Sequence, residues 1–220
     1  MLSATQIRET KGKRKISQIT AYDYGFAKIA ESARIDQILV GDSLANTMLG
    51  YKSTKCVGMN EMQIFVAAVC RGAPNTHVIA DMPYLSYKDP ATALENARKF
   101  IDLGASSVKL EGFYPDIIET LRKNGIEVCA HLGLLPQTAT SFKQVGRTAD
   151  EAERILREAK AIDEIGAFEC VLEHIPEALG KRVTEAVKLI TIGIGAGHET
   201  DGQVAVLHDT LGITAGKIPP

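Results

Sequence analysis

Short apolar runs of this chain repeatedly end in polar side chains that could bind a metal ion or move a proton. Asp42 and Ser43 follow the run from Gln37 to Gly41, and Asp81 ends the run from His77 to Asp81. If these runs are parallel strands, their carboxyl ends meet at one end of a barrel, where barrel enzymes place their active sites. In chain order the polar residues at these ends are Tyr22 and Asp23, Asp42 and Ser43, Asp81, Lys109 and Glu111, His131, and Glu173.

Asp42, Asp81 and Glu111 form an acidic set that suits a hard divalent cation. Mg²⁺ prefers oxygen ligands and usually keeps several waters, which leaves positions open for a substrate. A 2-keto acid could bind the cation through its carboxylate and keto oxygens, and the cation would stabilise the enolate that forms when an α-proton leaves. His131 could be a fourth ligand or a hydrogen-bond donor. The predicted chemistry is carbon–carbon bond formation through an enolate.

Lys109 and Glu173 complete this predicted chemistry. Lys109 would add positive charge beside the enolate oxygen, and Glu173 would serve as the general base if it stands away from the metal. Lys109 and Glu111 are two residues apart, so their side chains face the same side of a strand. A single charged residue after a strand is more often a solvated cap. Successive strands that all end in this way favour a functional site.

The elements that must position these residues follow from the alternation of apolar runs with longer amphipathic stretches, which is typical of βα units around a parallel sheet. Pro90 to Leu103 and Ala149 to Ile165 are two predicted helices. We predict one domain over residues 1–220, a (β/α)8 barrel with a polar N-terminal segment at 1–15; an open doubly wound sheet is the alternative. The predicted strands are Ile16 to Thr20, Gln37 to Gly41, His77 to Asp81, Ser107 to Leu110, Glu127 to His131, Glu169 to Leu172, Leu189 to Gly193, and a weak eighth at Ile213 to Thr214.

The composition argues against several classes of protein. Hydrophobic residues make up 45% of the 220 residues and charged residues 24%, so a globular core is expected. The formal net charge of −2, without a basic run interleaved with aromatics, argues against a nucleic-acid partner. No apolar run approaches the ~20 residues of a membrane-spanning helix, and no signal-peptide core is present. We expect a cytoplasmic protein without membrane contact, whose four cysteines are reduced.

Several ordered strings of residues, spread from about Ile7 to Pro219, carry a family resemblance. They are Ile19-Thr20-Ala21-Tyr22-Asp23, Val40-Gly41-Asp42-Ser43-Leu44, Arg71-Gly72-Ala73-Pro74, Ala80-Asp81-Met82-Pro83, Val108-Lys109-Leu110-Glu111-Gly112, His131-Leu132-Gly133-Leu134, and Ile192-Gly193-Ile194-Gly195-Ala196-Gly197 followed by Thr200-Asp201-Gly202-Gln203. Each string alone says little, whereas the ordered set is specific. The chain resembles the 3-methyl-2-oxobutanoate hydroxymethyltransferase family, also called ketopantoate hydroxymethyltransferase.

This resemblance implies a (β/α)8 barrel that uses Mg²⁺. The implied reaction transfers a hydroxymethyl group from the co-substrate 5,10-methylenetetrahydrofolate to 3-methyl-2-oxobutanoate and gives ketopantoate for pantothenate and coenzyme A biosynthesis. The family also implies a homo-oligomer, which is a decamer in many relatives. Carried over by position, the family's metal ligands fall on Asp42, Asp81 and Glu111, its general base on Glu173, its keto-acid contacts on Asp42, Ser43, Asp81 and Lys109, and a histidine of the same pocket on His131.

The chain also departs from the family pattern, and two rival interpretations stay open. Phe113 stands where the family usually has a second glycine, and the segment from Ser141 to Arg147 looks shorter than the family's glycine-rich loop. We expect the family's final helix to be absent after Ile218-Pro219. One rival is another Mg²⁺-dependent 2-keto acid enzyme, of the phosphoenolpyruvate mutase and isocitrate lyase type. Those lyases usually carry a reactive cysteine in a mobile loop, whereas the cysteines of this chain lie in or near apolar runs. The other rival is a catalytically silent scaffold barrel, which leaves the retained carboxylates and Lys109 unexplained.

Overall fold

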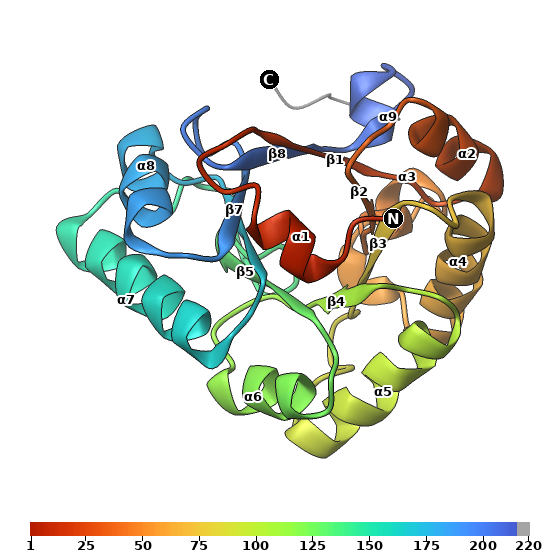
Figure 1. Cartoon of the computed structure of the whole chain (residues 1–220), viewed down its shortest axis with the longest axis horizontal. Coiled ribbons are helices and arrows are strands. Elements are labelled where there is room, and N and C mark those ends of the chain that lie inside the picture. The colour runs from red at the N-terminus through yellow and green to blue at the C-terminus, as the bar shows by residue number, and fades with distance from the viewer. Residues whose placement is uncertain (215–220) are drawn as a thin grey trace.

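The computed structural model describes residues 1–214, which form a closed barrel of eight parallel strands (Figure 1). Each strand pairs with the next one in the sequence, and β8 pairs with β1 through Ile16 and Gly202 to close the ring. The predicted (β/α)8 barrel is confirmed. The strands are β1 (Ile16–Thr20), β2 (Gln37–Val40), β3 (His77–Asp81), β4 (Ser107–Lys109), β5 (Val128–Gly133), β6 (Glu169–Glu173), β7 (Ile190–Ile194) and β8 (Gly202–Ala205).

The longer helices follow the strands in chain order and cover the outside of the barrel (Figure 1). The helix α7 begins at a capping box of Thr148 and Glu151 and ends at Gly166, whose φ of 99° favours glycine. No helix within residues 1–214 is long and apolar enough to cross a membrane. The longer helices are α2 (Tyr24–Ser32), α4 (Met59–Gly72), α5 (Pro90–Asp102), α6 (Pro115–Lys123), α7 (Ala149–Ile165) and α8 (Glu177–Ala186), and the short ones are α1 (Ala4–Arg8), α3 (Leu44–Thr47), the 3-10 helix η1 (Thr54–Cys56) and α9 (Leu207–Thr210).

The eighth strand lies at Gly202–Ala205, so the predicted strand at Ile213 to Thr214 is wrong. Those two residues come after α9, and Ile213 is 53% exposed. The residues of β8 alternate between buried and exposed, so this strand lacks the continuous apolar run that marks a strand buried on both faces. The single turn of α9 follows β8. The expected absence of a final helix after Ile218-Pro219 lies outside the described residues, which end at 214.

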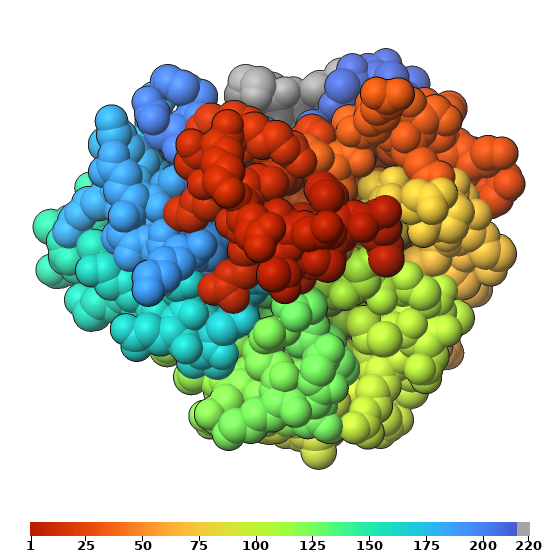
Figure 2. Space-filling model, viewed as in Figure 1, coloured from red at the N-terminus to blue at the C-terminus, as the bar shows by residue number. Residues whose placement is uncertain are grey.

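The N-terminal segment closes the barrel at the amino-terminal ends of the strands. The sequence predicts only a polar segment here, but Ala4–Arg8 forms α1, in which Ala4 and Ile7 are buried against interior residues of the barrel. Figure 1 shows α1 across this opening, and Figure 2 shows the same residues, in red, covering it. His77 Nδ1 lies 3.1 Å from the Leu2 carbonyl and ties the segment to β3. Polar groups at the opposite ends of the strands therefore line the end of the barrel that α1 leaves open.

A buried carboxyl group lies inside the barrel near the start of β6. Glu169 is fully buried and accepts hydrogen bonds from the side-chain amides of Gln18 at 2.9 Å and Gln37 at 2.6 Å. Burial disfavours the charged form and outweighs these donors, so the pKa of Glu169 is raised to about 7. Ionisation of Glu169 therefore destabilises the folded barrel.

We expect Glu169→Gln to remove a pH-dependent loss of stability. Because the folded-state pKa lies above the ordinary value of 4.5, the folded state holds the proton more tightly, and this stabilisation is lost as the pH rises from about 4.5 through about 7. Between these limits the free energy of unfolding of the wild type should fall, relative to the variant, by on the order of 3 kcal/mol. Urea denaturation at a series of pH values measures this difference. A stability difference between the two proteins that does not change with pH would contradict a raised pKa of Glu169.

Candidate active site

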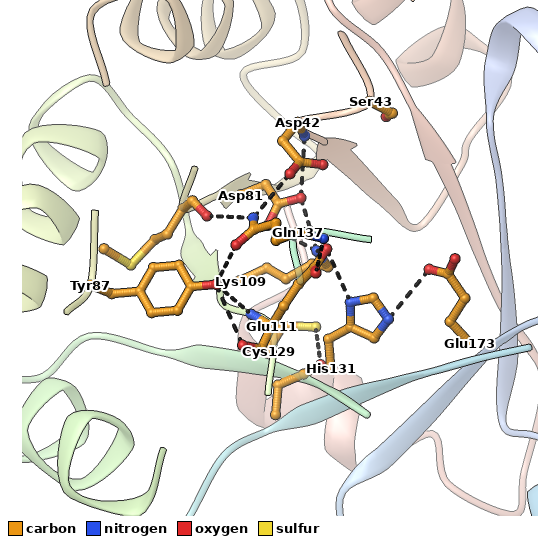
Figure 3. A network of polar contacts seen from close by, with 12 residues as sticks. Asp42, Ser43, Asp81, Tyr87, Lys109, Glu111, Cys129, His131, Gln137 and Glu173 are labelled. Atoms are coloured by element: carbon orange, nitrogen blue, oxygen red, sulfur yellow. Dashed lines mark hydrogen bonds and ion pairs between the residues drawn. The ribbon is translucent and has the colours of Figure 1, made fainter. Parts of the chain in front are cut away.

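The predicted site residues share one cavity at the carboxyl-terminal ends of the strands (Figure 3). Asp81 and Lys109 end β3 and β4 and are paired in the sheet register. His131 lies in β5, and Glu173 ends β6. The cavity has a volume of about 210 Å³. The residues predicted from the sequence that line it are Asp42, Ser43, Asp81, Lys109, Glu111, His131 and Glu173.

Lys109 forms the central ion pair of this cavity. Its Nζ lies 2.9 and 2.8 Å from the two carboxylate oxygens of Asp81 and 3.7 Å from Glu111 Oε1. All three side chains are at most 5% exposed, so water screens these charges poorly. Burial alone would lower the pKa of Lys109, but Asp81 and then Glu111 outweigh it and raise the pKa. Lys109 is therefore a permanent cation in the site.

The three acids around Lys109 differ in their affinity for a proton. Burial, followed by the charge of Asp81, raises the pKa of Asp42 to about 7. Burial also raises the pKa of Asp81, although Lys109 acts against it. Burial would raise the pKa of Glu111 as well, but His131 and Lys109 outweigh it and lower this pKa to about 2. Burial and the neighbouring acids thus hold Asp42 and Asp81 closer to their neutral forms than Glu111.

Gln137 and Tyr87 hold the acids in place, and neither residue was predicted from the sequence. Gln137 is fully buried in the segment after β5; its Nε2 donates to Asp42 Oδ2, and its backbone N–H donates to Glu111 Oε2, each at 2.9 Å. The Tyr87 hydroxyl donates to Gln137 Oε1 (Figure 3). Neither residue carries charge at neutral pH, and both lie in loops. The one usable signal for Gln137 was its position just after the predicted strand that carries His131.

His131 lies between two carboxylates. Its Nδ1 is 3.6 Å from Glu111 Oε1, and its Nε2 is 3.3 Å from Glu173 Oε2. Burial would lower the pKa of His131, but Glu111 and Glu173 outweigh it and raise the pKa to about 9. His131 is therefore a cation at neutral pH. The Glu173 side chain is 22% exposed, against 2% for that of Glu111, so Glu173 is the more accessible of the two acids.

Ser43 lines the cavity but lies outside this charge network. Its hydroxyl is 2.8 Å from the Tyr22 hydroxyl, and Figure 3 shows it apart from the linked acids. The structure thus brings the predicted acids together with Lys109 and His131. It leaves Ser43 beside them, without a contact to the charged groups drawn in Figure 3.

The acids match a divalent cation by their charge and oxygen atoms. Within residues 1–214, no three His, Cys, Asp or Glu side chains are arranged so that they could hold a metal ion together. Lys109 Nζ approaches Asp81 and Glu111 instead. Asp42 and Asp81 are neighbours, because the Asp42 backbone N–H donates to Asp81 Oδ2 at 3.2 Å. Mg²⁺ is often held by one or two carboxylates with waters and substrate, so this pair is chemically compatible with Mg²⁺. Asp42, Asp81 and Glu111 as metal ligands all stay predictions.

Comparison with known proteins decides between the families considered. The family model described as ketopantoate hydroxymethyltransferase matches residues 2–220. The chain belongs to the ketopantoate hydroxymethyltransferase family. A relative from Kosmotoga olearia named 3-methyl-2-oxobutanoate hydroxymethyltransferase is 50% identical over 99% of this chain and 84% of its own length. A relative of the same name from Caldivirga maquilingensis is 49% identical, over 94% of this chain and 80% of its own. Membership confirms the predicted enzyme class, a hydroxymethyltransferase.

Solved structures with other names share the barrel. A putative phosphonomutase from Burkholderia cenocepacia superposes with a TM-score of 0.74 at 15% identity, over 95% of this chain and 93% of its own. A 2,3-dimethylmalate lyase, titled as a PEP mutase/isocitrate lyase superfamily member, has a TM-score of 0.68 at 18% identity. The superposition covers 96% of this chain and 84% of the lyase. At such low identity the likeness shows the fold alone. The family match therefore favours the hydroxymethyltransferase over the lyase interpretation.

We expect Lys109 and Asp81 to be strongly coupled in stability. Lys109→Met leaves buried carboxylates without their cation, so the free energy of unfolding should fall by about 3–5 kcal/mol. In Lys109→Met/Asp81→Asn the loss should be about 1–3 kcal/mol smaller than the sum of the single losses. Urea denaturation in EDTA measures all four proteins.

The exposed ion pair between Lys99 and Glu95, 2.9 Å apart on α5, is the matched control. Its coupling should be far smaller than that of the buried pair, because water screens exposed charges. Losses at Lys109 and Asp81 that add within about 0.5 kcal/mol would contradict a stabilising buried pair.

Proposed function

We propose that this protein forms ketopantoate by transferring a hydroxymethyl group from 5,10-methylenetetrahydrofolate to 3-methyl-2-oxobutanoate, with Mg²⁺ as cofactor. The observation that carries the proposal is the single cavity in which Lys109, His131 and Glu173 meet Asp42 and Asp81. A fixed cation, a carboxylate pair for a metal and a separate accessible carboxylate are the groups that enolate chemistry requires. Relatives that are 45–50% identical bear the name of this activity.

The polar end of the keto acid would bind among Asp42, Asp81 and Lys109. When bound at the two aspartates, Mg²⁺ supplies a positive charge that attracts the keto acid's oxygens and stabilises negative charge on the keto oxygen. Lys109 Nζ is within 2.9 Å of Asp81, so it adds a second positive charge at the same place. Gln137 holds the Asp42 carboxylate in its orientation. The branched alkyl end of the substrate would face the apolar part of the cavity lining, which includes Val171, Ile194 and Val204.

Glu173 would accept the proton from C3 of the keto acid. It is the accessible carboxylate of the site, and in Figure 3 it lies on the opposite side of His131 from Asp42 and Asp81. Once the proton has moved to Glu173, the electron pair left on the substrate forms a bond from C3 to the methylene carbon of the donor. Both bonds from that carbon to folate nitrogens break, one as the carbon–carbon bond forms and the other as water supplies the hydroxyl group of the product. The proton held by Glu173 and one proton of the water pass to the two nitrogens, and tetrahydrofolate leaves.

His131 would position Glu173 and would not act as the base itself. Its Nε2 lies 3.3 Å from the Glu173 carboxylate, and its pKa of about 9 keeps the ring protonated at neutral pH. A protonated imidazole has no free nitrogen lone pair to accept a proton. The charged ring can instead attract the Glu173 carboxylate and hold it beside the cavity. Glu173 is therefore the better candidate for the base, and His131 is the next one.

We expect Glu173→Gln to keep keto-acid binding and lose proton transfer. The amide has nearly the same shape but cannot accept the C3 proton, so turnover should fall by roughly 10²- to 10⁴-fold. NMR of 3-methyl-2-oxobutanoate in deuterated water, with Mg²⁺ and no folate, follows exchange at C3 directly. Mass spectrometry of ketopantoate formed in the presence of the donor gives the complete reaction.

Glu177→Gln is the matched control, because Glu177 is an exposed carboxylate that pairs with His198 outside the cavity. It should exchange and turn over like the wild type. Near wild-type exchange in Glu173→Gln would place the base elsewhere. Absence of both exchange and ketopantoate in the wild type would overturn the proposed function in favour of a silent barrel.

A further inference from the structure

A second cavity of about 210 Å³ adjoins the catalytic one. It lies between the segment of η1 and the segment that follows β5, and the two cavities share Asn46, Thr54, Pro136 and Phe142 as lining residues. Each is smaller than the ~300–1,000 Å³ of a typical pocket for a drug-sized ligand. A ligand larger than a small keto acid would therefore extend from the catalytic cavity into this neighbour.

The charge of the lining reverses from one cavity to the next. The catalytic cavity is lined by carboxylates, whereas the neighbouring lining contains Lys52 and Lys55 and no Asp or Glu. Within residues 1–214, neither lysine forms an ion pair within 4.0 Å. Lys55 Nζ lies 5.3 Å from the centroid of the Tyr84 ring, a contact that leaves its charge unneutralised. The neighbouring cavity thus offers two unpaired cations to an anionic group.

An exposed aromatic ring and an unbonded hydroxyl group lie at the boundary between the two cavities. Phe142 lines both cavities and is 73% exposed, so its ring is available to stack on a planar ligand. Thr54 Oγ1 also lines both, and it is buried without a hydrogen-bond partner among the described residues. A buried hydroxyl left unbonded costs free energy that a ligand atom could recover.

We propose that this neighbouring cavity binds the carboxylate-bearing tail of the folate donor, with Lys52 and Lys55 facing its carboxylates and Phe142 against its aromatic part. This inference rests on the proposed function, which requires the methylene carbon of the donor in the catalytic cavity. The donor joins a planar ring system to a benzoyl group that ends in glutamate, so its anionic end must lie away from the reacting carbon. The four acids of the catalytic cavity would repel that end, and the two lysines would attract it.

The test is calorimetric titration of tetrahydrofolate, in its monoglutamate and triglutamate forms, into the wild type and Lys52→Met/Lys55→Met. Removing two partly solvated charges should weaken binding by roughly 3- to 30-fold. The advantage of the triglutamate over the monoglutamate should shrink in the variant, and the difference between the two proteins should decrease with added salt. Lys52→Arg/Lys55→Arg, which keeps both charges, should bind like the wild type.

Lys143→Met is the matched control, because Lys143 is exposed beside Phe142 but lines neither cavity. It should leave the affinity for tetrahydrofolate unchanged. A change of less than twofold in the double methionine variant, or an equal loss in Lys143→Met, would overturn the assignment. Exchange of the keto acid's C3 hydrogen needs no folate donor, so a failure of the proposed function would show as a loss of that exchange. If only the site for the folate tail is wrong, the exchange stays intact.

Discussion

The buried ion pair between Lys109 and Asp81 is the interaction on which the site and its barrel both depend. The two residues meet because β3 and β4 pair in the register that sets Asp81 beside Lys109. A shift by one residue would turn one of these side chains toward the helices outside the barrel. Such a shift would leave a buried charge without its partner, which is among the most destabilising changes in a protein interior. The same contact therefore fixes the sheet register and places the site's permanent cation.

The two ends of the barrel explain why the charges collect where they do. At one end α1 buries Ala4 and Ile7 against the barrel interior and closes the opening. At the other end the strands finish in polar residues, and loop residues such as Gln137 satisfy them with hydrogen bonds. The low dielectric constant around these buried groups strengthens the electrostatic interactions between them. The burial that raises the pKa of Asp42 to about 7 is thus also what makes a neutralising cation favourable there.

Much of this arrangement could be predicted from the sequence, because strands buried on both faces read as apolar runs and parallel strands share their carboxyl ends. The positions of Asp81, Lys109 and Glu173 followed from those two rules alone. β8 could not be found this way, since its residues alternate between buried and exposed. α1 is only five residues long and buries two side chains, too few for a periodic pattern. The contacts of Gln137 depend on how a loop folds back over the strands, which no local pattern encodes.

The most direct test of this account is calorimetric titration of Mg²⁺ into the protein with and without 3-methyl-2-oxobutanoate. If the cation and the keto acid share Asp42, Asp81 and Lys109, each should raise the affinity of the other by the same factor, roughly 5- to 150-fold. Asp81→Ala should abolish the binding of both. Mg²⁺ and keto-acid affinities that are independent of one another in the wild type, or unchanged in Asp81→Ala, would contradict the central claim that this buried charge cluster is the binding site.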